Sequence, residues 1–134
     1  MSNVAEIEGI GEVIARKLNG AGIVSTDDLL REGASRAGRE HIAERAGLTT
    51  QQVLEFVNRA DLMRVKGIGP QYSDLLEAAG VDSVKELARR DPENLLAKIL
   101  EVNEARHLVN RPPNLEAVKK IVGEAKELPG IVTH

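Results

Sequence analysis

Cysteine is absent from this chain of 134 residues, and aromatic side chains are almost absent. Without cysteine there can be no disulfide and no thiolate metal site. Phe56 and Tyr72 are the only aromatic residues, so a hydrophobic core has to be built from aliphatic side chains. No segment approaches the roughly 20 apolar residues of a membrane-spanning helix. The polar N-terminus does not resemble a signal peptide, and we therefore expect a cytoplasmic protein with no membrane contact.

Strong charge of one sign is also lacking, since the formal net charge is −3. This balance argues against indiscriminate coating of DNA, which is usually the work of a basic domain. It leaves room for a local basic face, because the field near a patch depends on the charges closest to it.

The sequence contains no recognisable catalytic or metal-binding pattern. No nucleophile stands at motif spacing from a base, and the carboxylates are not clustered. His41, His107 and His134 are too scattered to suggest a ligand set. We therefore expect no enzymatic activity, no metal site and no cofactor.

The most informative pattern is an internal repeat. With an offset of 58, residues 7–29 align with residues 65–87, and the alignment resumes with an offset of 65, where Val53, Phe56, Val57 and Ala60 meet Val118, Ile121, Val122 and Ala125. The second copy has thus gained seven residues (65 − 58 = 7) between the two matched segments. The identical pairs of the first segment are Gly9/Gly67, Ile10/Ile68, Gly11/Gly69, Leu18/Leu76, Ala21/Ala79, Gly22/Gly80, Ser25/Ser83 and Leu29/Leu87.

Almost the whole chain has the signals of α-helices. Ser83 with Glu86, and Thr49 with Gln52, have the spacing of capping boxes, and the alternation typical of strands is missing. We expect an all-α fold of two pseudo-repeated units: residues 1–62, and residues 63–128 with an enlarged loop. A helix near residues 50–63 should connect them and pack them as one compact body. Residues 129–134 should form a frayed tail.

Each repeat begins with a Gly-Ile-Gly turn. Glycine permits a positive φ and a close backbone approach, while the isoleucine between the two glycines can enter the core. The helix that follows starts with unpaired N–H groups and the positive end of its dipole. Such a turn can hold a phosphate oxygen without reading any base.

These paired turns resemble the helix-hairpin-helix motifs of DNA repair and recombination proteins, which have a SAM-like fold. Residues 7–62 are similar to the N-terminal domain of archaeal and eukaryotic recombinases, with residues 46–49 as a degenerate second hairpin. The whole chain, including Arg111-Pro112-Pro113, resembles a bacterial family of tandem helix-hairpin-helix domains of unknown function. In the resembled motifs the hairpin carbonyls sometimes hold a monovalent cation.

The resemblance implies a non-catalytic module that binds the backbone of double-stranded DNA regardless of sequence. The candidate DNA-binding residues are the four hairpin glycines and four nearby cations: Gly9, Gly11, Arg16, Lys17, Arg64, Lys66, Gly67 and Gly69. Two departures are evident, since Val13 and Gln71 stand where DNA-binding members carry a cation. Acidic residues also flank both turns.

An alternative is a module for protein–protein interaction or scaffolding that keeps the fold without binding DNA. Val13 and Leu75, which we expect to be exposed, favour it, because a DNA-binding surface would prefer polar or basic groups there. The cations at positions 31, 36, 39 and 45 alternate with glutamates, which is more typical of a solvated, salt-bridged face than of a DNA groove lining.

Overall fold

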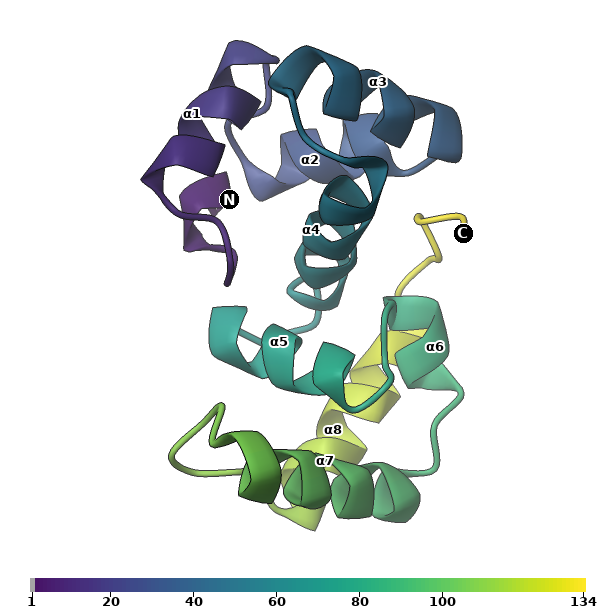
Figure 1. Cartoon of the computed structure of the whole chain (residues 1–134). Helices are drawn as coiled ribbons and strands as arrows, with labels where there is room; N and C mark the ends of the chain where they lie inside the picture. Colours follow the sequence, from purple (N-terminus) through teal and green to yellow (C-terminus); the bar gives the residue numbers. More distant parts are fainter. Residues whose placement is uncertain (1) are drawn as a thin grey trace. The chain divides into compact units, whose positions relative to one another are not determined.

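Helices make up most of the described chain, residues 2–134, in a computed structural model (Figure 1). Within these residues no sheet forms, and Asn3 and Ser25 make one isolated bridge. The all-α prediction is therefore confirmed. The elements in chain order are the 3-10 helix η1 (Val4–Glu6) and the α-helices α1 (Glu12–Gly20), α2 (Thr26–Gly33), α3 (Arg36–Ala46), α4 (Thr50–Leu62), α5 (Pro70–Ala78), α6 (Val84–Ala88), α7 (Pro92–Arg106) and α8 (Leu115–Glu127).

The chain divides into two compact units. The first comprises the residues up to Asp61 together with Ile131–His134, and the second is Leu62–Gly130. The division falls at the C-terminal end of α4. Along residues 2–134 no helix has the length and apolar character needed to cross a membrane. The packing of the two units as one body stays a prediction.

In the second unit, α6 and α7 both pack against α8, and α5 packs against α7. Aliphatic side chains fill the space between these helices, as the shortage of aromatics requires. Leu75, Leu76, Leu95 and Ile99 are all completely buried. Tyr72 is only partly buried and packs against the edge of this core.

In the first unit, α1 and α2 pack against α3, and η1 packs against α1. Leu18 and Leu29 are fully buried, as are Val53 and Val57 of α4. The helix predicted near residues 50–63 therefore presents Val53 and Val57 to a core.

Two helices of the first unit match helices of the second unit in length. Helices α1 and α5 have nine residues each, and α4 and α8 have 13 each. The seven extra residues fall between them. Helix α7 has 15 residues where α3 has 11, and residues 107–114 connect α7 to α8 where only residues 47–49 connect α3 to α4. Residues 89–91 precede α7 where residues 34–35 precede α3, whereas α6 has five residues where α2 has eight.

The C-terminal residues are ordered against the first unit, so the prediction of a frayed tail is wrong. The Val132 side chain is only 7% exposed. The Thr133 N–H donates to the Ala34 carbonyl at 2.9 Å, and the Thr133 carbonyl accepts from Arg39 Nη2 at 2.7 Å. The tail was expected to fray because a short segment after Pro129-Gly130 gives no local sign of these long-range partners.

Arg39 is buried, which contradicts its expected place on a solvated face. Its Nη1 donates to the carbonyls of Gly33 and Ala34, both at 3.0 Å, in addition to the bond to Thr133. Burial and the neighbouring Arg36 charge lower the pKa of Arg39. Arg39 thus joins the end of α2 to the C-terminal residues.

The three other cations that were expected on a solvated face, at positions 31, 36 and 45, are exposed. Two of them pair with acidic residues: Arg31 with Asp28 at 2.9 Å, and Arg36 with Glu40 at 3.5 Å.

Ser25 and Asp28 form a complete capping box at the start of α2. Asp28 Oδ2 accepts from the N–H groups of Ser25 and Val24, each at 3.1 Å, while Oδ1 accepts from Arg31 at 2.9 Å. These hydrogen bonds, led by the one from the Ser25 N–H, lower the pKa of Asp28 from 3.8 to about 2.

Replacing Arg39 with methionine should leave three carbonyls without their charged donor. Since hydrogen bonds to charged groups are individually strong, we expect a loss of about 2–3 kcal/mol in the free energy of unfolding. Arg36→Met removes an exposed guanidinium from the same helix and should change this energy by less than about 0.5 kcal/mol. Urea unfolding followed by circular dichroism measures both. Equal effects of the two substitutions would contradict the assigned role of Arg39.

The stabilisation by Asp28 should depend on pH. A carboxyl group with a lowered pKa in the folded state stabilises the protein at pH values above its unfolded pKa, and this effect disappears as the pH falls through the folded pKa. The difference in unfolding free energy between the wild type and Asp28→Asn should therefore be constant above about pH 5, fall progressively below it, and vanish only at about pH 1. Asp27→Asn, which removes an exposed carboxylate making no side-chain hydrogen bond within residues 2–134, is the control. A difference that stays unchanged between about pH 5 and pH 2 would refute this origin of the stabilisation.

Candidate functional site

The first Gly-Ile-Gly turn, here hairpin 1 (Glu8–Gly11), is a sharp connection between η1 and α1. Gly9 has φ +92°, a conformation that side-chain-bearing residues rarely adopt. The Ile10 N–H donates to the Ile7 carbonyl at 3.0 Å, and the Ile10 side chain is only 6% exposed. Gly11 precedes α1 with extended backbone and provides no side-chain cap.

Hairpin 2 (Lys66–Gly69) repeats this geometry before α5. Gly67 has φ +100°, and the Ile68 N–H donates to the Val65 carbonyl at 3.1 Å. The Ile68 side chain is 5% exposed. Gly69 again has extended backbone and leaves the helix without a side-chain cap. Both helices therefore begin at exposed glycines, with first-turn amides that no side chain occupies.

A side chain of a later helix lies beneath each hairpin. A Cβ atom on Gly9 would lie 3.7 Å from Phe56 Cε1, and one on Gly67 would lie 3.9 Å from Ile121 Cγ2. Phe56 and Ile121 are the positions that the sequence repeat aligns. Hairpin 1 has a second support, because Arg59 Nη1 donates to the Glu8 carbonyl at 3.1 Å. The aligned position in the second unit is Glu124.

Two of the four predicted cations are engaged within the protein. Arg16 pairs with Glu12, one turn earlier on α1, where both side chains are largely exposed. Arg64 Nη2 donates to the Pro129 carbonyl at 2.8 Å. Lys17 and Lys66 are exposed and make no hydrogen bond or ion pair to any residue in the described range 2–134. Each hairpin therefore has one lysine available to an outside anion.

The two hydrophobic positions that were expected to be exposed behave differently. Val13 is 64% exposed on α1, as predicted. Leu75 is completely buried in the second unit, so its predicted exposure is wrong. Leu75 lies three residues after Tyr72 on α5, and its side chain packs in the aliphatic core.

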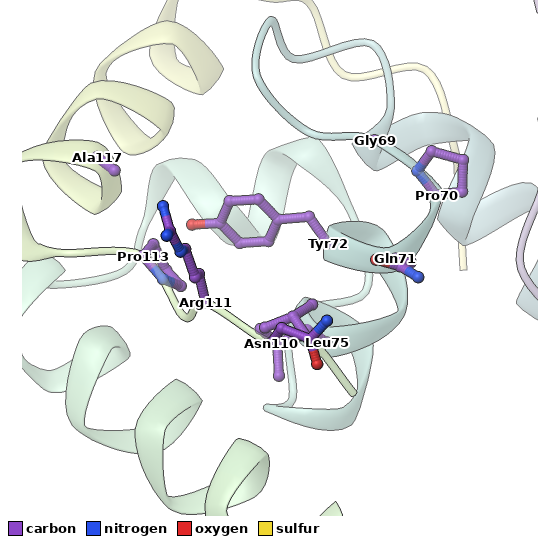
Figure 2. A pocket seen from close by; sticks show the side chains of 10 residues that line it. Gly69, Pro70, Gln71, Tyr72, Leu75, Asn110, Arg111, Pro113 and Ala117 are labelled. Atoms are coloured by element: carbon purple, nitrogen blue, oxygen red, sulfur yellow. The ribbon is translucent and has the colours of Figure 1, made fainter. Parts of the chain in front are cut away.

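A pocket of about 840 Å³, here the Tyr72 pocket, opens beside hairpin 2 (Figure 2). It is formed by the start of α5, the loop 107–114 and the start of α8, and the residues that line it are Gly69, Pro70, Gln71, Tyr72, Leu75, Val109, Asn110, Arg111, Pro113 and Ala117. Figure 2 shows the Tyr72 hydroxyl directed toward Arg111 and Pro113. That hydroxyl oxygen is buried without a hydrogen-bond partner, and burial raises the pKa of Tyr72 to about 12.

Asn103 holds the loop of this pocket in place. Its buried side chain accepts from the Val109 N–H at 2.9 Å and donates to the Val109 carbonyl at 3.0 Å. His107, with φ +51°, ends α7 just before the loop. The pocket was not predicted from the sequence; the available signals were the seven inserted residues and the Arg111-Pro112-Pro113 turn.

Acidic and histidine side chains do not gather into a candidate metal site anywhere in residues 2–134. The open helix starts, with their dipoles and the two available lysines, are suited instead to an anion.

The requirement for glycine at the positive-φ position of hairpin 2 can be tested by substitution. Gly67→Ala should destabilise the protein by about 1–2 kcal/mol, because an L-residue is strained at positive φ. Gly123→Ala in α8 has open space for a Cβ and should stabilise by about 0.5–1 kcal/mol through helix propensity. Chemical unfolding of both variants checks the two opposite signs. Destabilisation by both would show that the strain assigned to Gly67 is not the cause.

Comparison with known proteins identifies a family by sequence. No curated protein and no solved structure matches the chain. The sequence model of one family, described as a domain of unknown function (DUF4332), matches residues 8–128, which include both hairpins and the Tyr72 pocket. The chain therefore belongs to the DUF4332 family.

Proposed function

We propose that this protein is a non-catalytic module that binds the phosphate backbone of double-stranded DNA through its two hairpins. In this proposal both units are helix-hairpin-helix units of one tandem repeat. Binding is independent of base sequence, because backbone amides and lysines contact phosphates rather than base edges.

The observation that carries the proposal is the agreement of the two hairpins in backbone conformation and in the uncapped helix that follows each of them. Gly9 and Gly67 have φ values of +92° and +100°, and Gly11 and Gly69 each precede an uncapped nine-residue helix. A turn that served only to reverse the chain would not require an open helix start at both copies. Amide groups at such a start attract an anion together with the helix dipole.

The charges around the hairpins limit the expected affinity. Glu12 pairs with Arg16 at the start of α1 and places negative charge near the amides. Pro70, the first residue of α5, has no N–H to donate. With Lys17 and Lys66 as the available cations, we expect a few phosphate contacts and therefore weak, salt-sensitive binding.

A protein–protein interaction or scaffolding module is the second candidate. Val13 favours it, since a side chain 64% exposed near hairpin 1 offers an apolar contact. Leu75 gives it no support, because that side chain is fully buried. The exposed apolar surface near the hairpins is thus smaller than the sequence suggested, and DNA binding remains our principal proposal.

Fluorescence anisotropy with a labelled duplex, at several salt concentrations, tests the proposal. We expect micromolar binding whose log affinity falls with log salt at a slope of about −2 to −4. The double variant Lys17→Gln/Lys66→Gln should reduce the magnitude of this slope by about 2, since each lysine contributes about one phosphate contact.

The matched control is Lys98→Gln/Lys126→Gln, which changes the net charge equally at sites outside both hairpins. It should keep the wild-type slope. Absence of duplex binding at low salt would overturn the proposal. An equal reduction of the slope in the two double variants would show that the hairpin lysines do not contact the DNA.

A further inference from the structure

We propose that the Tyr72 pocket binds one nucleotide, with the base against its apolar wall and the phosphate at Arg111. The nucleotide is either free or the terminal nucleotide of a nucleic-acid strand, because both present the same base and phosphate. The pocket shares Gly69 with hairpin 2, yet the inference does not depend on duplex binding.

The size and walls of the pocket suit a nucleotide better than a small inorganic anion. Its volume of about 840 Å³ lies within the usual range of small-molecule sites, about 300–1,000 Å³. Pro70, Val109 and Pro113 provide apolar surface beside the Tyr72 ring. A planar base can bury its faces against such a wall, whereas a phosphate ion alone would leave most of it uncovered.

The polar side chains of the pocket have no partners within the protein. Gln71, Asn110 and Arg111 are exposed and make no side-chain hydrogen bond or ion pair within residues 2–134. The Tyr72 hydroxyl is buried and unpaired beside Arg111. A buried hydroxyl of this kind calls for a functional explanation. A polar atom of a ligand in the pocket would give the Tyr72 hydroxyl the acceptor that it lacks within the protein.

The polar groups of the pocket are of two kinds, one suited to the phosphate of a nucleotide and the other to its base. The guanidinium of Arg111 can bind a phosphate with two hydrogen bonds, and the uncapped start of α5 adds the positive end of its dipole. The amides of Gln71 and Asn110 offer both donors and acceptors, as the edge of a base requires. Few other ligand classes combine a flat ring, a hydrogen-bonding edge and an anion.

The pocket is specific to the second unit. In the first unit, residues 47–49 replace the eight-residue loop 107–114, so the residues that would correspond to Asn110 and Arg111 are missing. The loop is also fixed in place, since Asn103 holds Val109 by two hydrogen bonds. The longer loop 107–114 therefore gives the second unit a pocket wall that is already held in place before a ligand binds.

Titration of the isotope-labelled full chain with adenosine 5′-monophosphate, followed by amide chemical shifts, tests the inference. We expect saturable shifts at Gly69, Gln71 and Tyr72 and at residues 109–111, with tighter binding than for inorganic phosphate or adenosine alone. Arg111→Gln should weaken binding about tenfold, as expected from the loss of a bidentate phosphate contact. Ala117→Trp should abolish binding by filling the pocket. Arg45→Gln, which removes an exposed guanidinium from the first unit, should have no effect.

Absence of shifts with millimolar nucleotide would overturn the inference, as would equal affinity for inorganic phosphate, which would indicate an anion site only. Ala117→Trp could fail to fold, and Arg111→Gln then provides the test, because that side chain is exposed. A single strand with a 5′-phosphate, compared with the free nucleotide, identifies the source of the ligand. The titration contains no duplex, so its result can be distinguished from failure of the proposed DNA binding.

Discussion

The left-handed glycine at each hairpin, seated over a side chain of a later helix, is the constraint on which the rest of each unit depends. Gly9 lies over Phe56 and Gly67 over Ile121. The chain must reverse there within a few residues and still send Ile10 or Ile68 into the core. Only a residue tolerant of positive φ allows both. The same reversal leaves the next helix to begin at a bare glycine, so one backbone requirement produces both the packing and the open amides.

The two units satisfy this constraint with different surroundings. In the first, Arg59 braces the Glu8 carbonyl, and Arg39 ties the end of α2 to the C-terminal residues. The second has Glu124 where the first has Arg59. It has instead a longer α7 and the loop 107–114, clamped by Asn103. The two units thus share the hairpin geometry but differ in the contacts that hold each hairpin, and the Tyr72 pocket lies at the loop where their lengths differ most.

Local signals and the repeat were sufficient to predict much of this structure. Helix starts at capping boxes, the positive-φ glycines and the aliphatic stripe of α4 all follow from short-range spacing. The repeat also related Phe56 to Ile121 before any contact was known. What the sequence did not reveal depends on distant partners: Arg39 is buried because carbonyls of Gly33, Ala34 and Thr133 converge on it. Leu75 is buried by the second unit's core, although its aligned residue, Lys17, is exposed.

The charges near the hairpins indicate whether side chains or backbone amides would contribute most to binding a phosphate. Arg16 and Arg64 are held by Glu12 and by the Pro129 carbonyl, so side chains contribute only part of any attraction for phosphate. Apart from the N–H that Pro70 lacks, the amides at the starts of α1 and α5 do not depend on the neighbouring charged side chains, because the glycine turn fixes them. A binding site built mainly from backbone donors tolerates changes in nearby cations but not in turn geometry. For the proposed DNA binding, the glycines are therefore the primary determinant, and the lysines adjust its strength and salt dependence.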